Sequence, residues 1–567
     1  MRRESGPGPC YDRGRLRRGT RACGPFVPAR RIAGQVVALE ASGDLAAAAG
    51  ATSPAAIQRH SLLRYSPALV FLAVVFADSS RFADPDVWGH LRFGQAVLTT
   101  GHLPWRDPYA YSAVGLPWVS HEWLSEAIIA GSYDALGVLG LNLMKLGCSA
   151  ATVVFLALAM SETGASTTAQ FGILILAGMR LAPQMQYRPQ IFTYAMLSAL
   201  LALLARDNFR RRAPLWIAVP MFALWANLHG GWVAGLAAVG VYAAVSSAED
   251  WWNGRGLSRG AGLFGIAMLC ALATLVTPYG FGTWRTVART VENPAMLSVI
   301  NEWNPLLLAT VTELRASWGS ILYVISIAAI FGGLAAAIAL APCGSDGPLV
   351  AIAAMMIAVS FGAVRNVPLG LIAASVPLAR HASLAAYPRW RPSRAIAPAG
   401  PERASLLNQA IVASIALAIA AETGMFSRRL RFESVYPAGA IAFMKQRGLH
   451  GNLLCDYGWN DYAIFHCAPA SRVFMDSRYE MIYPRRVIED YLDFDLDRLG
   501  AERMLAAYRH DYVLIAPAAA AAQVMSRARG WTLIYQDANS RLYARSEAAA
   551  KMTGVPVIGS ARDADLP

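Results

Sequence analysis

Two aspartates separated by one proline, Asp84-Pro85-Asp86, follow the first apolar run of the sequence. A carboxylate near a lipid bilayer is costly, so an acidic pair here is expected to serve a function. Proline favours extended or turn geometry, which lets the two carboxylates share a divalent cation, Mg²⁺ or Mn²⁺, or act as a base and its orienting partner. The alternative is a helix cap, since Asp before Pro also begins helices well. We predict that Asp84 and Asp86 are catalytic, and both are candidate metal ligands.

Histidine, carboxylate and guanidinium side chains recur in the segments that connect the apolar runs. Such groups can hold a sugar or steady a departing phosphate. Each also has an ordinary structural role, because arginines at helix ends reach toward lipid headgroups and single histidines or glutamates often serve turns and caps. The residues that we expect to bind substrate are His90, His121, Glu122, Arg188, His229, Glu302 and Arg365.

The elements that must position these residues are expected to be membrane helices. The 567 residues are 55% hydrophobic and only 15% charged, which indicates lipid as the main solvent. A helix that crosses a bilayer needs about 17–25 apolar residues. Charge-poor runs near this length predict about eleven transmembrane helices, at 62–79, 138–160, 166–182, 189–205, 213–229, 231–248, 261–278, 317–341, 347–363, 366–380 and 405–425.

The distribution of arginine predicts the orientation of these helices. Loops rich in Lys and Arg stay in the cytoplasm. With the arginine-rich N-terminus inside, the basic loops 206–212, 249–260 and 380–404 all fall on the same side. Membrane orientation then explains the net charge of +13 more simply than nucleic-acid binding does. The candidate residues all fall on the opposite, extracytoplasmic face.

Composition divides the chain into four segments. Residues 1–60 are basic and lack an apolar run, which predicts a disordered cytoplasmic N-terminus. Residues 61–426 form the expected transmembrane domain, with a large first external loop at 80–137. Residues 427–548 alternate short β-rich runs with helical stretches, which predicts an extracytoplasmic α/β domain. Residues 549–567 are expected to form a flexible tail.

Several motifs in this layout resemble the GT-C class of membrane glycosyltransferases and bacterial membrane proteins placed beside it: Asp84 to Trp123, Trp225–His229, Pro278-Tyr279-Gly280, Glu302-Trp303 and Asp476–Glu480. The resemblance implies an inner-membrane enzyme that takes a hexosyl or pentosyl group from a polyprenyl-phosphate donor. A glycan, lipid or protein outside the membrane would accept it. In such enzymes a first-loop aspartate acts as base or metal ligand, and Asp84 and Asp86 match that position. Many relatives carry adjacent acidic residues instead, so metal dependence stays open.

Two other functions fit the sequence. The outward polar groups of a transporter or lipid flippase could form a gate, but no inverted repeat is evident and few charges lie within the apolar runs. A non-catalytic membrane scaffold could use its α/β domain to bind a periplasmic partner.

Overall fold

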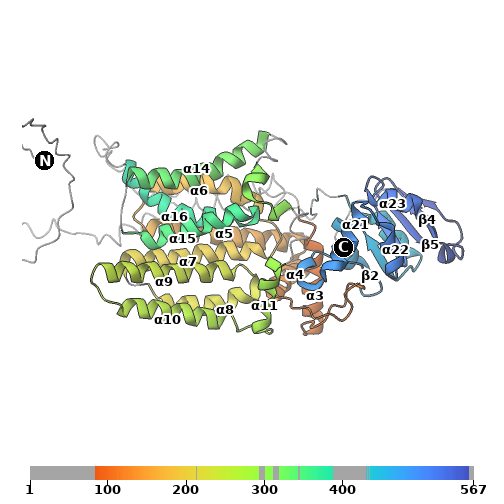
Figure 1. Ribbon diagram of the computed structural model, residues 1–567, viewed down its shortest axis with the longest axis horizontal. Coiled ribbons are helices and arrows are strands. Elements are labelled where there is room, and N and C mark those ends of the chain that lie inside the picture. Colours follow the sequence, from red (N-terminus) through yellow and green to blue (C-terminus); the bar gives the residue numbers. More distant parts are fainter. Residues whose placement is uncertain are drawn as a thin grey trace, which may run out of the picture. The chain divides into compact units, whose positions relative to one another are not determined.

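The computed structural model describes residues 83–211, 213–292, 301–310, 318–341, 345–386, 430, 432 and 435–560 (Figure 1). These residues belong to one compact unit. The basic segment 1–60 and the expected spans at 62–79 and 405–425 lie outside the described residues.

Nine apolar helices of the described chain form a bundle. They coincide with nine of the eleven apolar runs expected from the sequence, and their buried residues form one hydrophobic core. The helices are α5 (Val138–Glu162), α6 (Thr167–Leu181), α7 (Gln190–Arg210), α8 (Ala218–Leu228), α9 (Trp232–Trp252), α10 (Ser258–Ala273), α14 (Trp318–Leu340), α15 (Gly347–Gly362) and α16 (Val367–Ala386). Short 3₁₀ turns adjoin them at η1 (Ala182–Gln184), η2 (Leu215–Ile217) and η4 (Val364–Asn366).

Fewer helices meet the length and composition needed to cross a membrane than the eleven that the sequence predicts. Within the described part, three helices are long and apolar enough to cross a membrane: Val138–Glu162, Trp232–Trp252 and Val364–Ala386. Shorter apolar helices lie at Leu215–Leu228, Ser258–Ala273, Val324–Leu340 and Gly347–Gly362. These helices support a membrane protein, but they do not establish the expected count of about eleven crossings.

Close packing within the bundle depends on small residues at helix contacts. A Cβ at Gly235 of α9 would lie 2.4 Å from the ring of Trp225 in α8, so only glycine lets these helices approach so closely. Trp225 and Trp232 are fully buried beside this contact. The packing fixes the turn between α8 and α9, where His229 stands.

Residues 83–136 contain two packed helices, α3 (Val87–Thr100) and α4 (Trp123–Leu136). They touch at Gly94, where a Cβ would lie 2.0 Å from the backbone oxygen of Glu126. Asp86 occupies the N-cap position of α3, yet among the described residues its carboxylate accepts no capping hydrogen bond. Asp84 Oδ1 instead accepts a hydrogen bond from the Asp86 N–H at 3.0 Å. The pair therefore begins a helix and keeps the Asp86 carboxylate available for other contacts.

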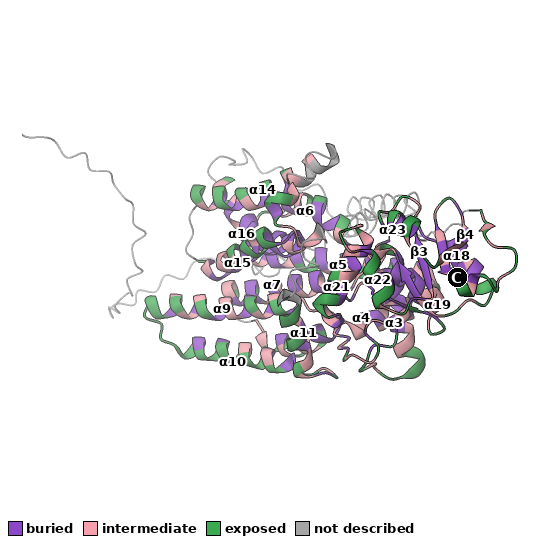
Figure 2. Cartoon of the chain, turned by 45° about the vertical axis from the view of Figure 1, so that its right-hand side comes forward, coloured by how far each residue is buried: buried purple, intermediate pink, exposed green. Residues whose placement is uncertain are grey.

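The C-terminal region is an α/β layer, as the sequence predicts. Its six-stranded sheet has the order β2-β1-β3-β5-β4-β6, in which β1 pairs in parallel with β2 and β3. The strands are β1 (Asn452–Cys455), β2 (Arg472–Val473), β3 (Tyr512–Ile515), β4 (Trp531–Gln536), β5 (Arg541–Arg545) and β6 (Val557–Ile558). The helices are α18 (Ala438–Gln446), α19 (Asn460–Cys467), α20 (Tyr479–Ile482), α21 (Arg485–Asp495), α22 (Glu502–Ala507), α23 (Ala521–Arg527) and α24 (Ser546–Ala549). The central strand β3 is buried along its whole length (Figure 2), and β6 lies within the segment 549–567 that we assigned to the tail.

The segment between α3 and α4 extends this sheet at the β2 edge. Ala110 forms a parallel bridge with Val473. The Tyr111 N–H donates to the Val473 oxygen at 2.9 Å, and the Val473 N–H donates to the Tyr109 oxygen at 3.0 Å. These bonds satisfy backbone groups that an open sheet edge would leave exposed. The sheet is therefore completed by residues far away in the sequence.

A buried arginine strengthens the same junction. Arg478 follows β2, and its guanidinium lies 2.8 Å from Asp107 Oδ1 and also pairs with Asp476. The ring of Trp118 lies 4.3 Å from it and that of Phe93 4.6 Å. A buried charge needs such pairing to offset its lost hydration. The α/β region is thus joined to α3 and to the segment that follows it.

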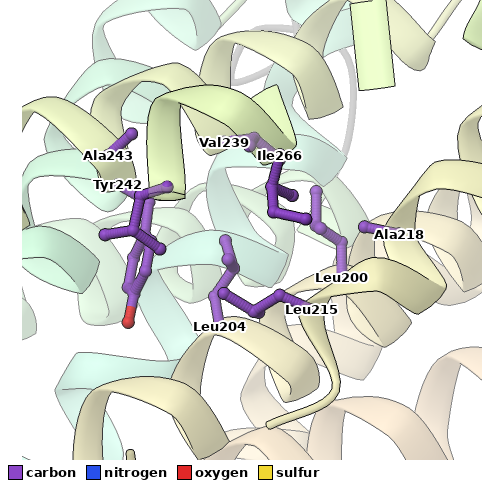
Figure 3. Close-up of a pocket in the computed structure, with 9 residues that line it drawn as sticks. Leu200, Leu204, Leu215, Ala218, Val239, Tyr242, Ala243 and Ile266 are labelled. Carbon is purple, nitrogen blue, oxygen red and sulfur yellow. The ribbon is translucent and has the colours of Figure 1, made fainter. Parts of the chain in front are cut away.

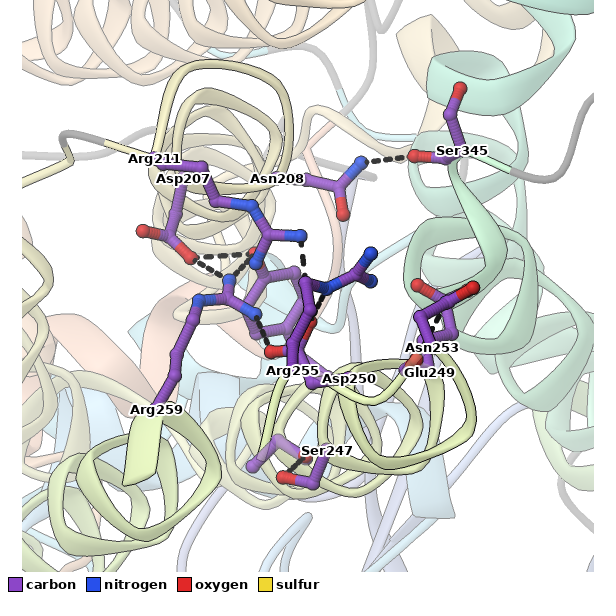
Figure 4. A network of polar contacts seen from close by, with 12 residues as sticks. Asp207, Asn208, Arg211, Ser247, Glu249, Asp250, Asn253, Arg255, Arg259 and Ser345 are labelled. Atoms are coloured by element: carbon purple, nitrogen blue, oxygen red, sulfur yellow. Dashed lines mark hydrogen bonds and ion pairs between the residues drawn. The ribbon is translucent and has the colours of Figure 1, made fainter. Parts of the chain in front are cut away.

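An ion-pair network lies at the ends of α7 and α9 and the start of α10 (Figure 4). Arg259 contacts Asp207 Oδ2 at 2.5 Å and Asp250 Oδ2 at 3.1 Å, and Arg255 contacts Asp250 Oδ1 at 2.7 Å. The Tyr242 hydroxyl donates to Asp207 at 2.8 Å. Two of the arginines behind our orientation argument therefore also have a structural role.

Candidate active site

Arg188, just before α7, gathers acidic residues from two distant segments. Its guanidinium lies 3.3 Å from Asp84 Oδ2 and 3.2 Å from Asp86 Oδ2. It also lies 2.7 Å from Oε1 of Glu302, in η3 (Asn301–Trp303). The structure thus brings four of the expected site residues together. The acidic pair faces a guanidinium here, while a cation shared by Asp84 and Asp86 stays a prediction.

Two of the three acids beside Arg188, Asp86 and Glu302, differ in their readiness to take up a proton. Burial, followed by repulsion from Asp84, raises the pKa of Asp86 to about 7, although Arg188 acts in the opposite direction. Arg188 has the larger effect on Glu302 and lowers the pKa of that carboxyl. A carboxyl with a pKa near the working pH is suited to general base catalysis. Asp86 is therefore better able than Glu302 to accept a proton.

Arg365 adds a second guanidinium near this cluster. It lies in η4, and its guanidinium carbon stands 4.3 Å from the centre of the Trp303 ring. Its charge also contributes to the lowered pKa of Glu302. Arg365 is therefore oriented by an aromatic ring, within electrostatic reach of the acids around Arg188.

Glu122 is the centre of a second cluster and stands at the N-cap position of α4. Its Oε1 lies 3.4 Å from His121 Nε2 and 3.5 Å from His229 Nε2. Burial alone would raise the pKa of Glu122, but His121, His229 and His90 together lower it far below the usual value. Glu122 is therefore a carboxylate at neutral pH. This cluster joins three more of the expected residues.

His90 links the two clusters. It lies one helical turn after Asp86, and its Nδ1 is 3.5 Å from Glu126 Oε1. Burial opposes protonation of His90, but the hydrogen bond and charge of Glu126, with the charges of Glu122 and Asp86, raise its pKa above the usual value. The Ser120 hydroxyl donates to the other Glu126 oxygen at 2.9 Å.

Three of these side chains could hold a metal ion. One ligand atom each from His90, Glu122 and Glu126 lie within 4.8 Å of one another. Imidazole and carboxylate ligands suit divalent ions such as Mn²⁺ and Zn²⁺, and carboxylates also suit Mg²⁺. The donor set therefore fits a divalent cation, although it differs from the Asp84–Asp86 pair expected from the sequence.

Sequence reasoning missed two residues of the site. Glu126 is 5% exposed and follows Glu122 by four residues, as His90 follows Asp86. Since residues four apart share a helix face, this repeated spacing was a usable signal. Thr193 of α7 lies with its hydroxyl 2.8 Å from His229 Nδ1. It was missed because nothing near it in the sequence shows that α7 packs against the turn at His229.

A cavity among α7, α8, α9 and α10 is a poor candidate for the site. Apart from the Tyr242 hydroxyl, its lining is apolar (Figure 3). The lining residues are Leu200, Leu204, Leu215, Ala218, Val239, Tyr242, Ala243, Leu263 and Ile266. Because a reaction site needs polar groups that converge on the substrate, the polar clusters around Asp86 and Glu122 are the better candidate.

Archaeal oligosaccharyltransferases share this arrangement of helices. The Archaeoglobus fulgidus oligosaccharyltransferase tethered to an acceptor peptide with the NVT sequon is 10% identical, with a TM-score of 0.51 over 80% of this chain and 69% of that chain. AglB from the same organism, in complex with an inhibitory peptide and a dolichol-phosphate, is 12% identical, with a TM-score of 0.52 over 81% and 70%. This chain has the GT-C glycosyltransferase fold. No family description and no curated protein sequence matches it.

The GT-C fold confirms the resemblance drawn from the sequence motifs. It also agrees with a mostly helical chain that ends in an α/β region. At 10% and 12% identity the likeness establishes the fold alone. The chemistry of this protein must therefore be argued from its own side chains.

Proposed function

We propose that this GT-C protein is a membrane glycosyltransferase that moves a sugar from a polyprenyl-phosphate donor to an extracytoplasmic acceptor. The observation that carries the proposal is the Asp86 carboxyl, which has a pKa of about 7 and lies 3.2 Å from the guanidinium of Arg188. This pairing sets a proton acceptor beside a group that binds phosphate well. One of the similar structures, AglB, holds a dolichol-phosphate.

In the proposed reaction, Asp86 accepts the proton of an acceptor hydroxyl while that oxygen attacks the anomeric carbon of the sugar. The bond between this carbon and the phosphate oxygen breaks, and its electron pair stays on the phosphate. The leaving polyprenyl phosphate is already anionic, so a nearby cation suffices to stabilise it. Asp84 would orient Asp86 through the turn that their hydrogen bond closes.

Five further residues are proposed to hold the substrates. Arg188 and Arg365 would bind the phosphate, which requires Arg188 to exchange part of its contact with Glu302 for phosphate oxygens. Histidine rings near Glu122 would donate hydrogen bonds to sugar hydroxyls. His90 and His121 would supply these donors directly, and His229 would contribute by orienting Glu122.

A divalent cation, if used, would be held by His90, Glu122 and Glu126. When bound, such an ion supplies positive charge near the sugar phosphate. The ligands must be deprotonated to bind it, so the raised pKa of His90 means that protons compete with the cation at low pH.

Replacing Glu126 with glutamine should weaken Mn²⁺ binding, because one carboxylate ligand becomes a neutral amide. We expect the Kd for Mn²⁺ to rise at least tenfold, on the order of 1.4 kcal/mol, when free Mn²⁺ is followed by electron paramagnetic resonance with the purified full-length protein. The matched control is Asp134→Asn, an exposed carboxylate on the same helix. Equal Mn²⁺ affinity in wild type, E126Q and the control would contradict the proposed ligand set.

The rate of transfer should increase with pH around neutrality. Asp86 acts as a base only when it is deprotonated, and its pKa of about 7 lies above that of a normal aspartate. We therefore expect kcat/KM to rise about tenfold per pH unit well below pH 7 and to level off above it. Measurements from pH 5.5 to 9 in proteoliposomes test this. A profile that stays flat down to pH 5.5 would exclude Asp86 as the titrating base.

The proposal includes the orientation expected from the sequence. Residues 1–60 and the basic loops would lie in the cytoplasm, with the candidate site and the α/β region outside. Three exposed tryptophans near the network of Figure 4 support a membrane boundary at that end, since indoles favour the interface. They are Trp216 in η2 (65% exposed) and Trp251 (62%) and Trp252 (83%) at the end of α9.

One comparison separates this function from the two alternatives. Lipid-linked and surface glycans are analysed with and without the gene, and purified protein is incubated with a labelled polyprenyl-phosphate sugar in proteoliposomes. Loss of one glycan together with sugar transfer in vitro supports the glycosyltransferase. Movement of unchanged donor across the bilayer would indicate a flippase instead, and unaltered glycans with a stable co-purifying protein would indicate a scaffold.

A further inference from the structure

The Nδ1 atom of His229 faces two hydrogen-bond donors. The backbone N–H of Gly231 donates to it at 2.9 Å, and a backbone N–H cannot accept. The Thr193 hydroxyl lies 2.8 Å from the same nitrogen. Since Nδ1 accepts a hydrogen bond, a neutral ring must carry its proton on Nε2.

The direction of the Thr193 hydrogen bond follows from its other partner. The indole N–H of Trp225 donates to Thr193 Oγ1 at 2.9 Å, and an indole nitrogen can only donate. The Thr193 oxygen is therefore the acceptor toward Trp225, which leaves its own proton for His229. Thr193 is 2% exposed and Trp225 is fully buried, so bulk water does not compete for these bonds.

The turn after α8 is shaped to bring these groups together. A Cβ at Gly231 would lie 2.4 Å from Thr193 Oγ1 and 3.0 Å from His229 Nδ1. Any other residue at 231 would therefore push apart the threonine and the histidine.

The opposite ring nitrogen points toward the candidate active site. His229 Nε2 lies 3.5 Å from Glu122 Oε1, the same oxygen that lies 3.4 Å from His121. With a proton on Nε2, His229 donates a hydrogen bond to the Glu122 carboxylate, which is favourable. Without this proton, a lone pair on Nε2 would face a lone pair on the Glu122 oxygen.

We infer that Thr193, with the Gly231 amide, is a positioning residue that holds His229 in the Nε2–H form, so that His229 donates to Glu122 and fixes the orientation of that carboxylate. His229 is then a hydrogen-bond donor rather than a base or a metal ligand. The inference rests on the proposed function in one respect, which is that Glu122 belongs to the reaction site. The tautomer itself follows from the hydrogen bonds.

Nitrogen NMR of protein labelled with ¹⁵N-histidine tests the tautomer directly at pH 7.5, with the full-length protein in lipid. The His229 signals are assigned by their loss in His229→Gln. We expect a protonated Nε2 and an unprotonated Nδ1 in the wild type. An unprotonated Nε2 would overturn the inference, whether or not the protein transfers sugar. A protein without transferase activity that shows the expected spectrum would contradict only the proposed function.

The role of Thr193 is tested by two substitutions of similar size. Thr193→Ser keeps the hydroxyl and should retain kcat within about twofold, whereas Thr193→Val should lower kcat about 10–100-fold, as for loss of an outer hydrogen-bond partner, with KM for the donor changed less. In Thr193→Val the His229 signals should also show a second tautomer. Thr152→Val should leave both readouts unchanged, because among the described residues the partner of this buried hydroxyl is the Cys148 oxygen. A wild-type kcat together with wild-type spectra in Thr193→Val would refute the role. If Thr193→Val fails to fold, the histidine spectra of Thr193→Ser and of the wild type are compared instead.

Discussion

Replacing Asp86 with asparagine should abolish detectable sugar transfer while the protein still inserts and folds. The amide has nearly the shape of the carboxyl but cannot accept a proton. Loss of a general base costs about 10²–10⁴-fold in rate. The substitution also removes a group whose burial raises its pKa to about 7, so folding should not suffer. Transfer is measured with labelled donor in proteoliposomes, and the melting temperature is measured on the same preparation.

Asp134→Asn is the matched control for Asp86→Asn. Asp134 is an exposed carboxylate that accepts a hydrogen bond from Gln95 at 2.9 Å, and its loss should leave the rate unchanged. Full activity in Asp86→Asn would rule out the base. A similar loss of activity in both variants would point to a general effect of carboxylate removal instead.

Replacing Arg188 with methionine should have an effect of comparable size through a different route. The variant removes the cation proposed to hold the phosphate, for which we expect kcat/KM to fall on the order of 10²–10³-fold. It also leaves Asp84, Asp86 and Glu302 without the guanidinium that pairs with all three. Losing one partner of a largely buried ion pair costs about 3–5 kcal/mol, so the melting temperature should drop as well.

A second substitution separates stability from phosphate binding. Glu302→Gln in the Arg188→Met background removes one of the unpaired charges, so it should restore much of the lost melting temperature but none of the activity. Arg472→Met, at an exposed arginine on β2, is the control. Recovery of transfer in the double variant would show that Arg188 serves only to neutralise acids, and its proposed contact with phosphate would be wrong.

Much of the helical architecture could be predicted because it depends on local composition. Nine apolar runs coincide with described helices, since the length of a run and its lack of charge decide whether a helix forms in lipid. The number of crossings is harder to predict, because Ser258–Ala273 and Gly347–Gly362 are apolar but short. Length alone does not separate a short spanning helix from a buried one.

The membership of the site could be predicted better than its contacts. All nine expected residues lie in the described region, and the motif Asp84-Pro85-Asp86 lies at the centre of the candidate site. The sequence does not show that the oxygens of this pair turn to Arg188, which lies 104 residues after Asp84. It also does not reveal Glu126 as the partner of His90, because that pairing depends on how closely α3 and α4 approach at Gly94. Such contacts arise from tertiary packing, which composition and spacing do not reveal.

The bridge between Ala110 and Val473 has a consequence for biosynthesis. The Ser112 hydroxyl bonds to the Phe474 oxygen, and these residues are 362 positions apart. At about 5–20 residues per second, the ribosome needs roughly 20–70 s to supply the later partner. During that time the segment around Ala110 has been synthesised, but the β2 strand that it pairs with has not. A fragment that begins near residue 435 would in turn display an uncovered β2 edge prone to self-association. Recombinant versions of the α/β region should therefore be more soluble when residues 101–122 are supplied with it.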